Sequence, residues 1–128
     1  METFSGSKSM SENYKNGVDY YYIKYGKFYR NPHYSIIKNC LCYIYHNFQL
    51  NWGNVLDLAC CSGEVTSILL EIEPNLMITS CDPYTYEAFH NKTGRIAKKW
   101  SFSDIQNGLF SQINISFDVV VLSFAAHL

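Results

Sequence analysis

Residues 54–64, which read NVLDLACCSGE, combine an acidic side chain at the end of an apolar run with a series of small residues. The acidic side chain is Asp57. It is followed by the small residues Ala59, Cys60, Cys61, Ser62 and Gly63. Small residues let a backbone pass close to a bound molecule, and a helix that begins after them presents free N–H groups to that molecule. The segment predicts a site for a nucleotide or for S-adenosylmethionine.

Asp82 is the second candidate. It follows an apolar segment, and its spacing from Asp57 is close to the ~20 residues at which an acidic residue binds ribose hydroxyls. The two oxygens of a carboxylate can accept hydrogen bonds from both vicinal hydroxyls. Because Pro83 comes next, the alternative is that Asp82 caps a turn or a helix. We favour the ribose interaction because Asp82 lies at the end of a predicted strand.

Asp104, in the segment WSFSDI, is the third candidate. A carboxylate at this position could accept a hydrogen bond from the exocyclic amine of adenine, while Ile105 packs on the ring. The alternative, that Asp104 caps the helix after it, has equal weight. We predict no metal site, because the adjacent Cys60 and Cys61 have no second pair of ligands with tetrahedral spacing.

Strands and helices must alternate to bring these side chains together. The predicted strands are residues 54–58, 77–81, 100–102 and 117–123. The predicted helices are residues 33–48, 63–72, 84–89 and 105–110. This alternation indicates right-handed crossovers and an α/β fold with a parallel sheet, in which the ends of several strands share one ligand site.

Composition divides the chain into three predicted parts. Residues 1–17 are rich in Ser, Gly, Lys and Asn, which is typical of a flexible arm. Residues 18–53 form a tyrosine-rich helical segment, and residues 54–128 form the α/β domain. The predicted apolar face of the helix in the second part consists of Ile36, Ile37, Cys40, Leu41, Ile44 and Phe48.

The overall composition, with 48% hydrophobic and 16% charged residues, is typical of a globular protein. A net charge of -1 gives no reason to expect nucleic-acid binding. The 5 cysteines lack a C-x-x-C spacing and fit reduced thiols. The N-terminus lacks a secretory pattern, and no apolar run approaches the ~18 residues of a membrane span, so we expect a cytoplasmic protein without membrane contact.

Together, the motifs resemble those of class I S-adenosylmethionine-dependent methyltransferases over roughly residues 20–128. DLACCSG is similar to the motif of the first strand in that family, often written DLACGSG, and Asp82 matches the acidic residue that binds ribose. SFSDI resembles the adenine-binding segment, and FDVVVLSFAAHL resembles the fourth strand and the segment after it. YGKFYRNPH resembles the N-terminal lid. Apart from the lid, the four motifs follow the order of the family at plausible spacings.

The resemblance implies a Rossmann-like fold of three layers, with helices on both faces of a parallel sheet. It also implies methyl transfer from S-adenosylmethionine to an unidentified nucleophile by in-line displacement. Asp57 would bind the amino group of the methionine moiety. Tyr25 and Tyr29 in the lid would contact the sulfonium, with ordinary packing as the alternative. The implied cofactor-binding residues are Asp57, Ala59, Cys60, Cys61, Gly63, Asp82, Pro83, Asp104, Ile105, Tyr25, Tyr29 and Ser123.

The same resemblance assigns the role of general base to His127, which follows the fourth strand. The alternative is that His127 is an ordinary surface histidine. Two of the glycine positions of the family are occupied by Ala59 and Cys61. A positive φ at Cys61 would cost on the order of 1–3 kcal/mol. Because a pyrophosphate needs the closest approach at this turn, a dinucleotide oxidoreductase is a less favoured alternative.

The fold is also expected to be incomplete, with about four strands where the family has seven. Residues 119–122 would then lie along an open, apolar sheet edge, which is a site of pairing or aggregation. Three explanations are open: the sequence is a fragment, a partner chain or a second copy covers the edge, or the sheet is rearranged. We expect weak or absent activity for these 128 residues alone. The alternative function is a noncatalytic, methyltransferase-like binding module that pairs through this edge.

Overall fold

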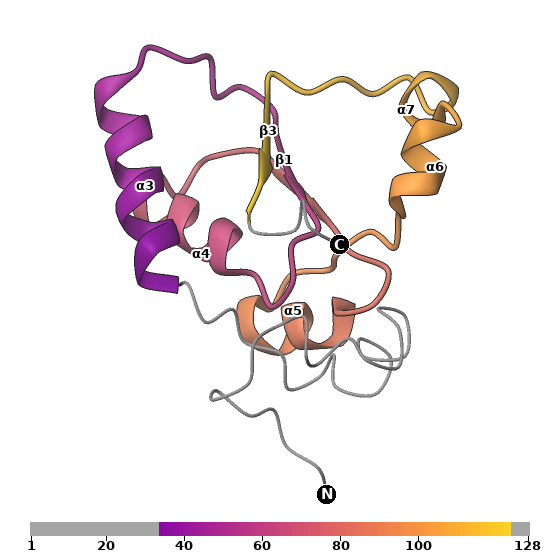
Figure 1. Ribbon diagram of the computed structural model, residues 1–128, viewed down its shortest axis with the longest axis horizontal. Coiled ribbons are helices and arrows are strands. Elements are labelled where there is room, and N and C mark those ends of the chain that lie inside the picture. The colour runs from indigo at the N-terminus through magenta and orange to yellow at the C-terminus, as the bar shows by residue number, and fades with distance from the viewer. Residues whose placement is uncertain (1–33, 124–128) are drawn as a thin grey trace, which may run out of the picture.

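Three short parallel strands form the sheet at the centre of the structure, a computed structural model that describes residues 34–123 (Figure 1). The strands are β1 (Val55–Leu58), β2 (Ile78–Cys81) and β3 (Val119–Leu122). The helices are α3 (Tyr34–Asn47), α4 (Glu64–Ile72), α5 (Tyr86–Thr93), α6 (Phe102–Gln106) and α7 (Leu109–Gln112). The α/β class with a parallel sheet is therefore confirmed for the described residues.

The strand order is β2-β1-β3, so the first strand in the sequence lies in the middle of the sheet. Val55 lies opposite Ile78 on one side and Val119 on the other. Beyond β2, Cys81 forms an isolated parallel bridge with Lys98. Because β1 pairs in parallel with both β2 and β3, the carboxyl ends of the strands lie at one edge of the sheet, where a shared site is expected.

The main core lies between the sheet and the helices α3 and α4. It contains Ile37, Leu41, Val55, Val65, Ile68, Leu69 and Ile78. Helices α6 and α7 lie on the opposite side of the sheet in Figure 1. Val55 of the apolar run that predicted β1 belongs to this core, and Leu56 is buried as well, as expected for a central parallel strand.

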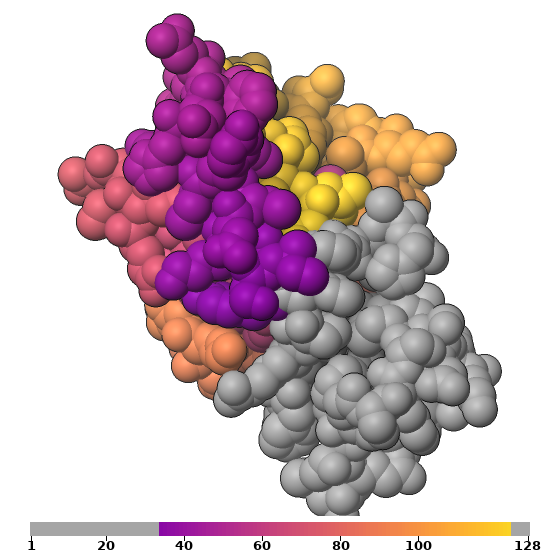
Figure 2. All heavy atoms as spheres, turned by 60° about the vertical axis from the view of Figure 1, so that its left-hand side comes forward, coloured from indigo at the N-terminus to yellow at the C-terminus, as the bar shows by residue number. Residues whose placement is uncertain are grey.

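Helix α3 agrees closely with the predicted helix at residues 33–48. Ile37 and Leu41 of its predicted apolar face are buried, whereas Ile36 and Phe48 are 51% and 54% exposed. Only part of that face packs on α4, because a helix presents about one stripe to a neighbour. Figure 2 shows the outer surface of α3 in indigo, with the yellow atoms of β3 beside it.

The predicted strand at residues 100–102 is wrong, because this segment begins a helix. The Ser101 side chain accepts a hydrogen bond from the Asp104 N–H at 3.0 Å, and the Asp104 carboxylate accepts one from the Ser101 N–H at 2.9 Å. This capping box starts α6 at Phe102. The described residues therefore hold three strands instead of four, and the nearest equivalent of the missing strand is the bridge at Lys98.

Two predicted helices have different bounds in the structure. The helix expected at residues 105–110 is divided into α6 and α7 at Gly108, whose φ is +91°. The helix expected at residues 84–89 is α5, which begins at Tyr86 and extends to Thr93, with Gly94 as its C-cap. Within residues 34–123, no helix combines the length and apolar character needed to cross a bilayer.

Candidate functional site

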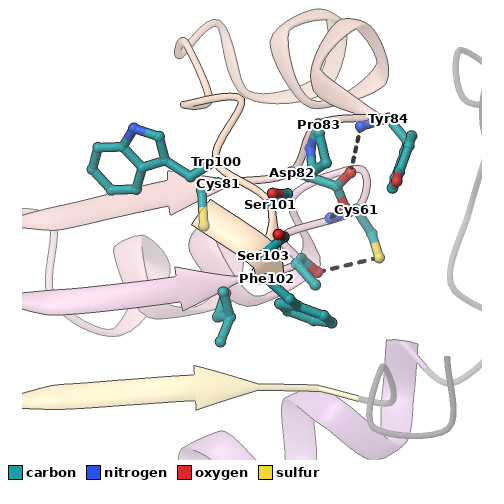
Figure 3. A pocket seen from close by; sticks show the side chains of 11 residues that line it. Cys61, Cys81, Asp82, Pro83, Tyr84, Trp100, Ser101, Phe102 and Ser103 are labelled. Carbon is teal, nitrogen blue, oxygen red and sulfur yellow. Dashed lines mark hydrogen bonds between the residues drawn. The ribbon is translucent and has the colours of Figure 1, made fainter. Parts of the chain in front are cut away.

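A cavity of about 200 Å³ lies at the carboxyl ends of β1 and β2 (Figure 3). Its walls come from the turn after β1, from the end of β2, and from the segment that leads into α6. The residues that line it include Ala59, Cys61, Cys81, Asp82, Trp100 and Phe102. Ligand pockets usually measure roughly 300–1,000 Å³, so this cavity matches one part of a nucleotide-sized molecule.

The turn that lines the cavity has three residues in the left-handed region. Ala59 has a φ of 57° and Cys61 a φ of 54°, and Gly63 follows with a φ of 95°. The positive φ considered for Cys61 is therefore observed. Left-handed backbone costs a non-glycine residue roughly 1–2 kcal/mol, so the turn retains this geometry at a cost in stability.

Hydrogen bonds hold this turn in place from the side of β2. The Cys61 N–H donates to one Asp82 carboxylate oxygen at 3.3 Å, and the Thr85 hydroxyl donates to the Cys61 carbonyl at 3.1 Å. The Cys60 N–H donates to the Cys81 carbonyl at 3.0 Å. These contacts tie the left-handed residues to the neighbouring strand.

Asp82 lines the cavity and also caps the turn that leads into α5. Its other carboxylate oxygen accepts the N–H of Tyr84 at 2.8 Å and of Thr85 at 3.1 Å. The capping alternative is therefore observed. A carboxylate has about four acceptor positions, and the three N–H donors leave capacity for a further hydrogen bond from the cavity.

Asp57 lies behind the turn instead of in the cavity. Its side chain is buried, and it accepts a hydrogen bond from the Thr66 hydroxyl at 2.6 Å. The Thr66 hydroxyl is in turn 2.7 Å from the Ser80 hydroxyl. Burial raises the pKa of Asp57 to about 7, while hydrogen bonding by Thr66 opposes this shift.

The other predicted turn residues face the protein interior. Cys60 packs with Phe89 and Ala97 in a second core cluster, and burial raises the pKa of its thiol. A Cβ atom on Gly63 would lie 2.5 Å from the Thr93 side chain of α5. Gly63 therefore permits close packing between the turn and α5, and neither Cys60 nor Gly63 lines the cavity.

The remaining predicted site residues divide into three groups. Pro83 lines the cavity, whereas Asp104, Ile105 and Ser123 are not among its lining residues. Asp104 forms the capping box described above, which was the alternative to adenine binding. The predicted site residues Tyr25, Tyr29 and His127 lie outside the described part of the chain.

The aromatic wall of the cavity, formed by Trp100 and Phe102, was not among the predicted site residues. Phe102 is 48% exposed. Trp100 also packs edge-on against Phe110, with ring centroids 5.6 Å apart. Trp100 directly precedes the segment SFSDI and Phe102 lies within it, but the predicted adenine contacts were those of Asp104 and Ile105.

The titratable side chains that line the cavity are those of Cys61, Cys81, Asp82 and Tyr84. Asp82 is the titratable carboxyl that lines the cavity, beside the thiols of Cys61 and Cys81. Burial raises the pKa of Cys81 to about 11, so its thiol stays protonated at neutral pH. Among residues 34–123, no three metal-ligating side chains come together.

Comparisons with known proteins add one relative. No protein-family model matches the chain, and no solved structure matches it. An uncharacterized protein of Schizosaccharomyces pombe is 30% identical over 158 aligned residues, which cover 94% of this chain. The chain spans 64% of the length of that relative, whose name states no activity.

Proposed function

We propose that this chain forms the cofactor-binding part of an S-adenosylmethionine-dependent methyltransferase of class I, and that its cavity holds the nucleoside part of the cofactor. The observation that carries the proposal is the positive φ of Ala59, Cys61 and Gly63. These are the three positions at which the family has Gly-x-Gly-x-Gly. The turn keeps the glycine-type geometry although two of the glycines are replaced.

The retained strain supports a ligand role for the turn. Unusual backbone geometry persists where the surrounding structure imposes it, and such residues cluster at ligand sites. Here Asp82 and Thr85 impose it through their hydrogen bonds to Cys61. A turn that served only to connect β1 with α4 would not need left-handed conformations at Ala59 and Cys61.

The arrangement of the strands gives further support. The segment at Lys98 bridges to β2, and β2-β1-β3 follows, so the order corresponds to 3-2-1-4. Dinucleotide-binding sheets begin with this order and bind their ligand at the carboxyl ends of the strands. A Rossmann-like fold, in which the bridge at Lys98 stands for a short third strand, is therefore part of the proposal.

In this proposal, Asp82 accepts a hydrogen bond from the ribose, and the aromatic wall of Trp100 and Phe102 packs on the adenine. Methyl transfer itself needs mainly the positioning of donor and acceptor. The methyl acceptor is unidentified, and we expect weak or no activity from this chain alone. The buried thiols of Cys60, Cys61 and Cys81 suit a reducing, cytoplasmic setting.

Calorimetric titration of the full chain with S-adenosylmethionine tests the proposal. Phe102→Ala removes a partly exposed ring from the cavity, and Phe48→Ala removes a ring of similar exposure that does not line it. Base stacking on an aromatic side chain contributes about 1–3 kcal/mol. We expect Phe102→Ala to weaken binding by about 5-fold or more and Phe48→Ala to leave it unchanged.

Two results would argue against this function. One is the absence of binding by a chain that is folded by circular dichroism. The other is stronger binding of a nicotinamide dinucleotide than of demethylated cofactor in competition, which would favour the oxidoreductase alternative.

A second candidate function is a noncatalytic module that pairs through the edge of its sheet, with a second copy or a partner chain. The observation that favours it is the exposure of β3, where Val120 and Leu122 are 54% and 43% exposed. Natural edge strands usually carry a charge, a proline or a bulge that prevents pairing. Val119–Leu122 has the sequence VVVL and carries no charge or proline.

A further inference from the structure

Asp57, Thr66 and Ser80 form a buried polar cluster that joins three elements directly behind the cavity. Their exposed fractions are 1%, 0% and 4%. Asp57 comes from β1, Thr66 from the first turn of α4, and Ser80 from β2, opposite Asp57 in the sheet register. Oxygen–oxygen distances of 2.6 Å and 2.7 Å connect the three side chains in a line.

The charges around this cluster disfavour a carboxylate. Glu64 at the start of α4 and Asp82 after β2 are both carboxyl groups that act on Asp57. The thiols of Cys60 in the turn and Cys81 in β2 are also close enough to interact with it. On the β3 side, the register partner of Asp57 is the apolar Val121. Among the described residues, Thr66 stabilises the ionised form of Asp57 through a side-chain and a main-chain hydrogen bond.

The direction of the hydrogen bonds depends on whether Asp57 carries a proton. When Asp57 is ionised, it can only accept, so the Thr66 hydroxyl donates to it and Ser80 donates to Thr66. When Asp57 is protonated, its own O–H can donate to Thr66, which then donates to Ser80. Either direction between Thr66 and Ser80 fits their geometry. One proton therefore reverses the polarity of a chain of hydrogen bonds that crosses from β1 to β2.

We propose that the Asp57–Thr66–Ser80 cluster is a proton-operated switch that changes the conformation of the turn at Ala59 and Cys61, and thereby the shape of the cavity. Asp57 is two residues before Ala59, whose left-handed backbone begins the turn. Cys61 is tied to the residue after β2, Asp82, which adjoins the strand that carries Ser80. A change at either end of the cluster reaches one side of the cavity through short, hydrogen-bonded connections.

The relevant pH range follows from burial, which raises the pKa of Asp57 to about 7. The switch thus works near neutrality. If the proposed function also holds, on which this step alone rests, the cationic sulfonium of the cofactor favours the ionised carboxyl. Binding would then release a proton, and affinity would rise as the pH is raised from 6 to 8.

Carbon-13 NMR of the full chain, labelled at aspartate, tests the switch directly. We expect the Asp57 carboxyl to titrate near pH 7. The amide signals of Ala59 and Cys61 and the indole signal of Trp100 should move with the same midpoint. In Asp57→Asn, these three signals should no longer respond in that range. A carboxyl that titrates below pH 5, or turn signals that stay still while it titrates, would overturn the proposal.

Variants of Thr66 keep the test independent of whether Asp57→Asn folds. Thr66→Val removes the hydroxyl that donates to the ionised carboxyl, so the midpoint of Asp57 and of the turn signals should move upward together. Thr66→Ser keeps a hydroxyl and should leave the midpoint near the wild-type value. Equal midpoints in both variants would contradict the switch. A failure to bind S-adenosylmethionine at any pH would instead contradict the proposed function, because the proton titration needs no cofactor.

Discussion

At the scale of single residues, the two adjacent cysteines have opposite roles. Cys61 lines the cavity with a positive φ, whereas Cys60 packs in the core with Phe89 and Ala97. Nothing in the local sequence distinguishes them, since both are small thiols in one turn. The difference arises because successive backbone conformations turn one side chain inward and the other toward the cavity.

Glycine substitutions at the two cysteines should therefore have different effects on stability. Cys61→Gly relieves a left-handed conformation, which offsets the lost side-chain packing and the entropy cost of glycine. We expect its free energy of unfolding to stay within about 1 kcal/mol of the wild type. Cys60→Gly relieves no strain and removes a buried side chain, so we expect a loss of about 2 kcal/mol or more. Urea unfolding measures both, and equal losses would contradict the role assigned to backbone strain.

At the scale of secondary structure, glycines determine where helices begin and how closely they pack. Gly63 is the N-cap of α4 and Gly108 is the N-cap of α7, both with a positive φ. Their surroundings differ, because a Cβ atom on Gly63 would meet Thr93 and Phe89 of α5, whereas nothing lies within 4 Å of one on Gly108. The two positions share the same backbone strain but not the same steric constraint.

Alanine substitutions at these glycines separate strain from packing. Gly108→Ala should cost about 1–2 kcal/mol for the left-handed backbone alone. Gly63→Ala should cost at least about 1–3 kcal/mol more, because the new methyl group overlaps Thr93 and forces α5 to move. Differential scanning calorimetry of the two variants measures the difference. Similar thermal shifts would show that α5 does not restrict the turn.

At the scale of the whole molecule, the buried carboxyl makes stability depend on pH. Burial raises the pKa of Asp57 to about 7 in the folded state, whereas aspartate in an unfolded chain titrates near ~3.9. The folded state holds this proton more tightly, so protonation stabilises the fold between these pH values. The contribution is fully present below pH ~4 and is lost as the pH rises to about 7, with a total on the order of 4 kcal/mol.

A comparison of the wild type with Asp57→Asn isolates this contribution from the other carboxyl groups. Between pH 5 and pH 8, the free energy of unfolding of the wild type should fall relative to that of the variant, which carries no titrating group at this position. Urea unfolding at four pH values across this range measures the difference. A difference that does not change with pH would show that Asp57 is ionised in the folded state throughout.

The exposed edge of the sheet is the second property of the whole molecule, and Figure 2 shows β3 at the surface beside α3. If the edge pairs with another copy, Val120→Lys should reduce self-association, because a lysine on an edge strand opposes pairing. Ile96→Lys adds the same charge at a residue that is 83% exposed and outside β3, and serves as the control. Sedimentation velocity measures association, and equal behaviour of the two variants would exclude the edge as the contact.

The apolar runs and small residues of the sequence were enough to determine the α/β class, the central strand β1, the start of α4 and the position of Asp82 at a strand end. These features depend on the local spacing of apolar residues and on the conformational freedom of glycine, and both can be inferred from one short segment of sequence. A ligand site was predicted at the carboxyl ends of the strands for the same reason, and a cavity lies at this edge of the sheet.

Only the tertiary structure decided what the side chains around that cavity face. Asp57 was assigned to the ligand, but the register of β1 with β2 directs it to Thr66 and Ser80. The segment at residues 100–102 was predicted as a strand, but a capping box with Asp104 makes it a helix start and leaves Trp100 and Phe102 as the aromatic wall. The position of Asp57 depends on contacts between different elements of the fold. The start of α6 depends on a competition between two hydrogen-bonding patterns. Neither can be read from the spacing of residue types.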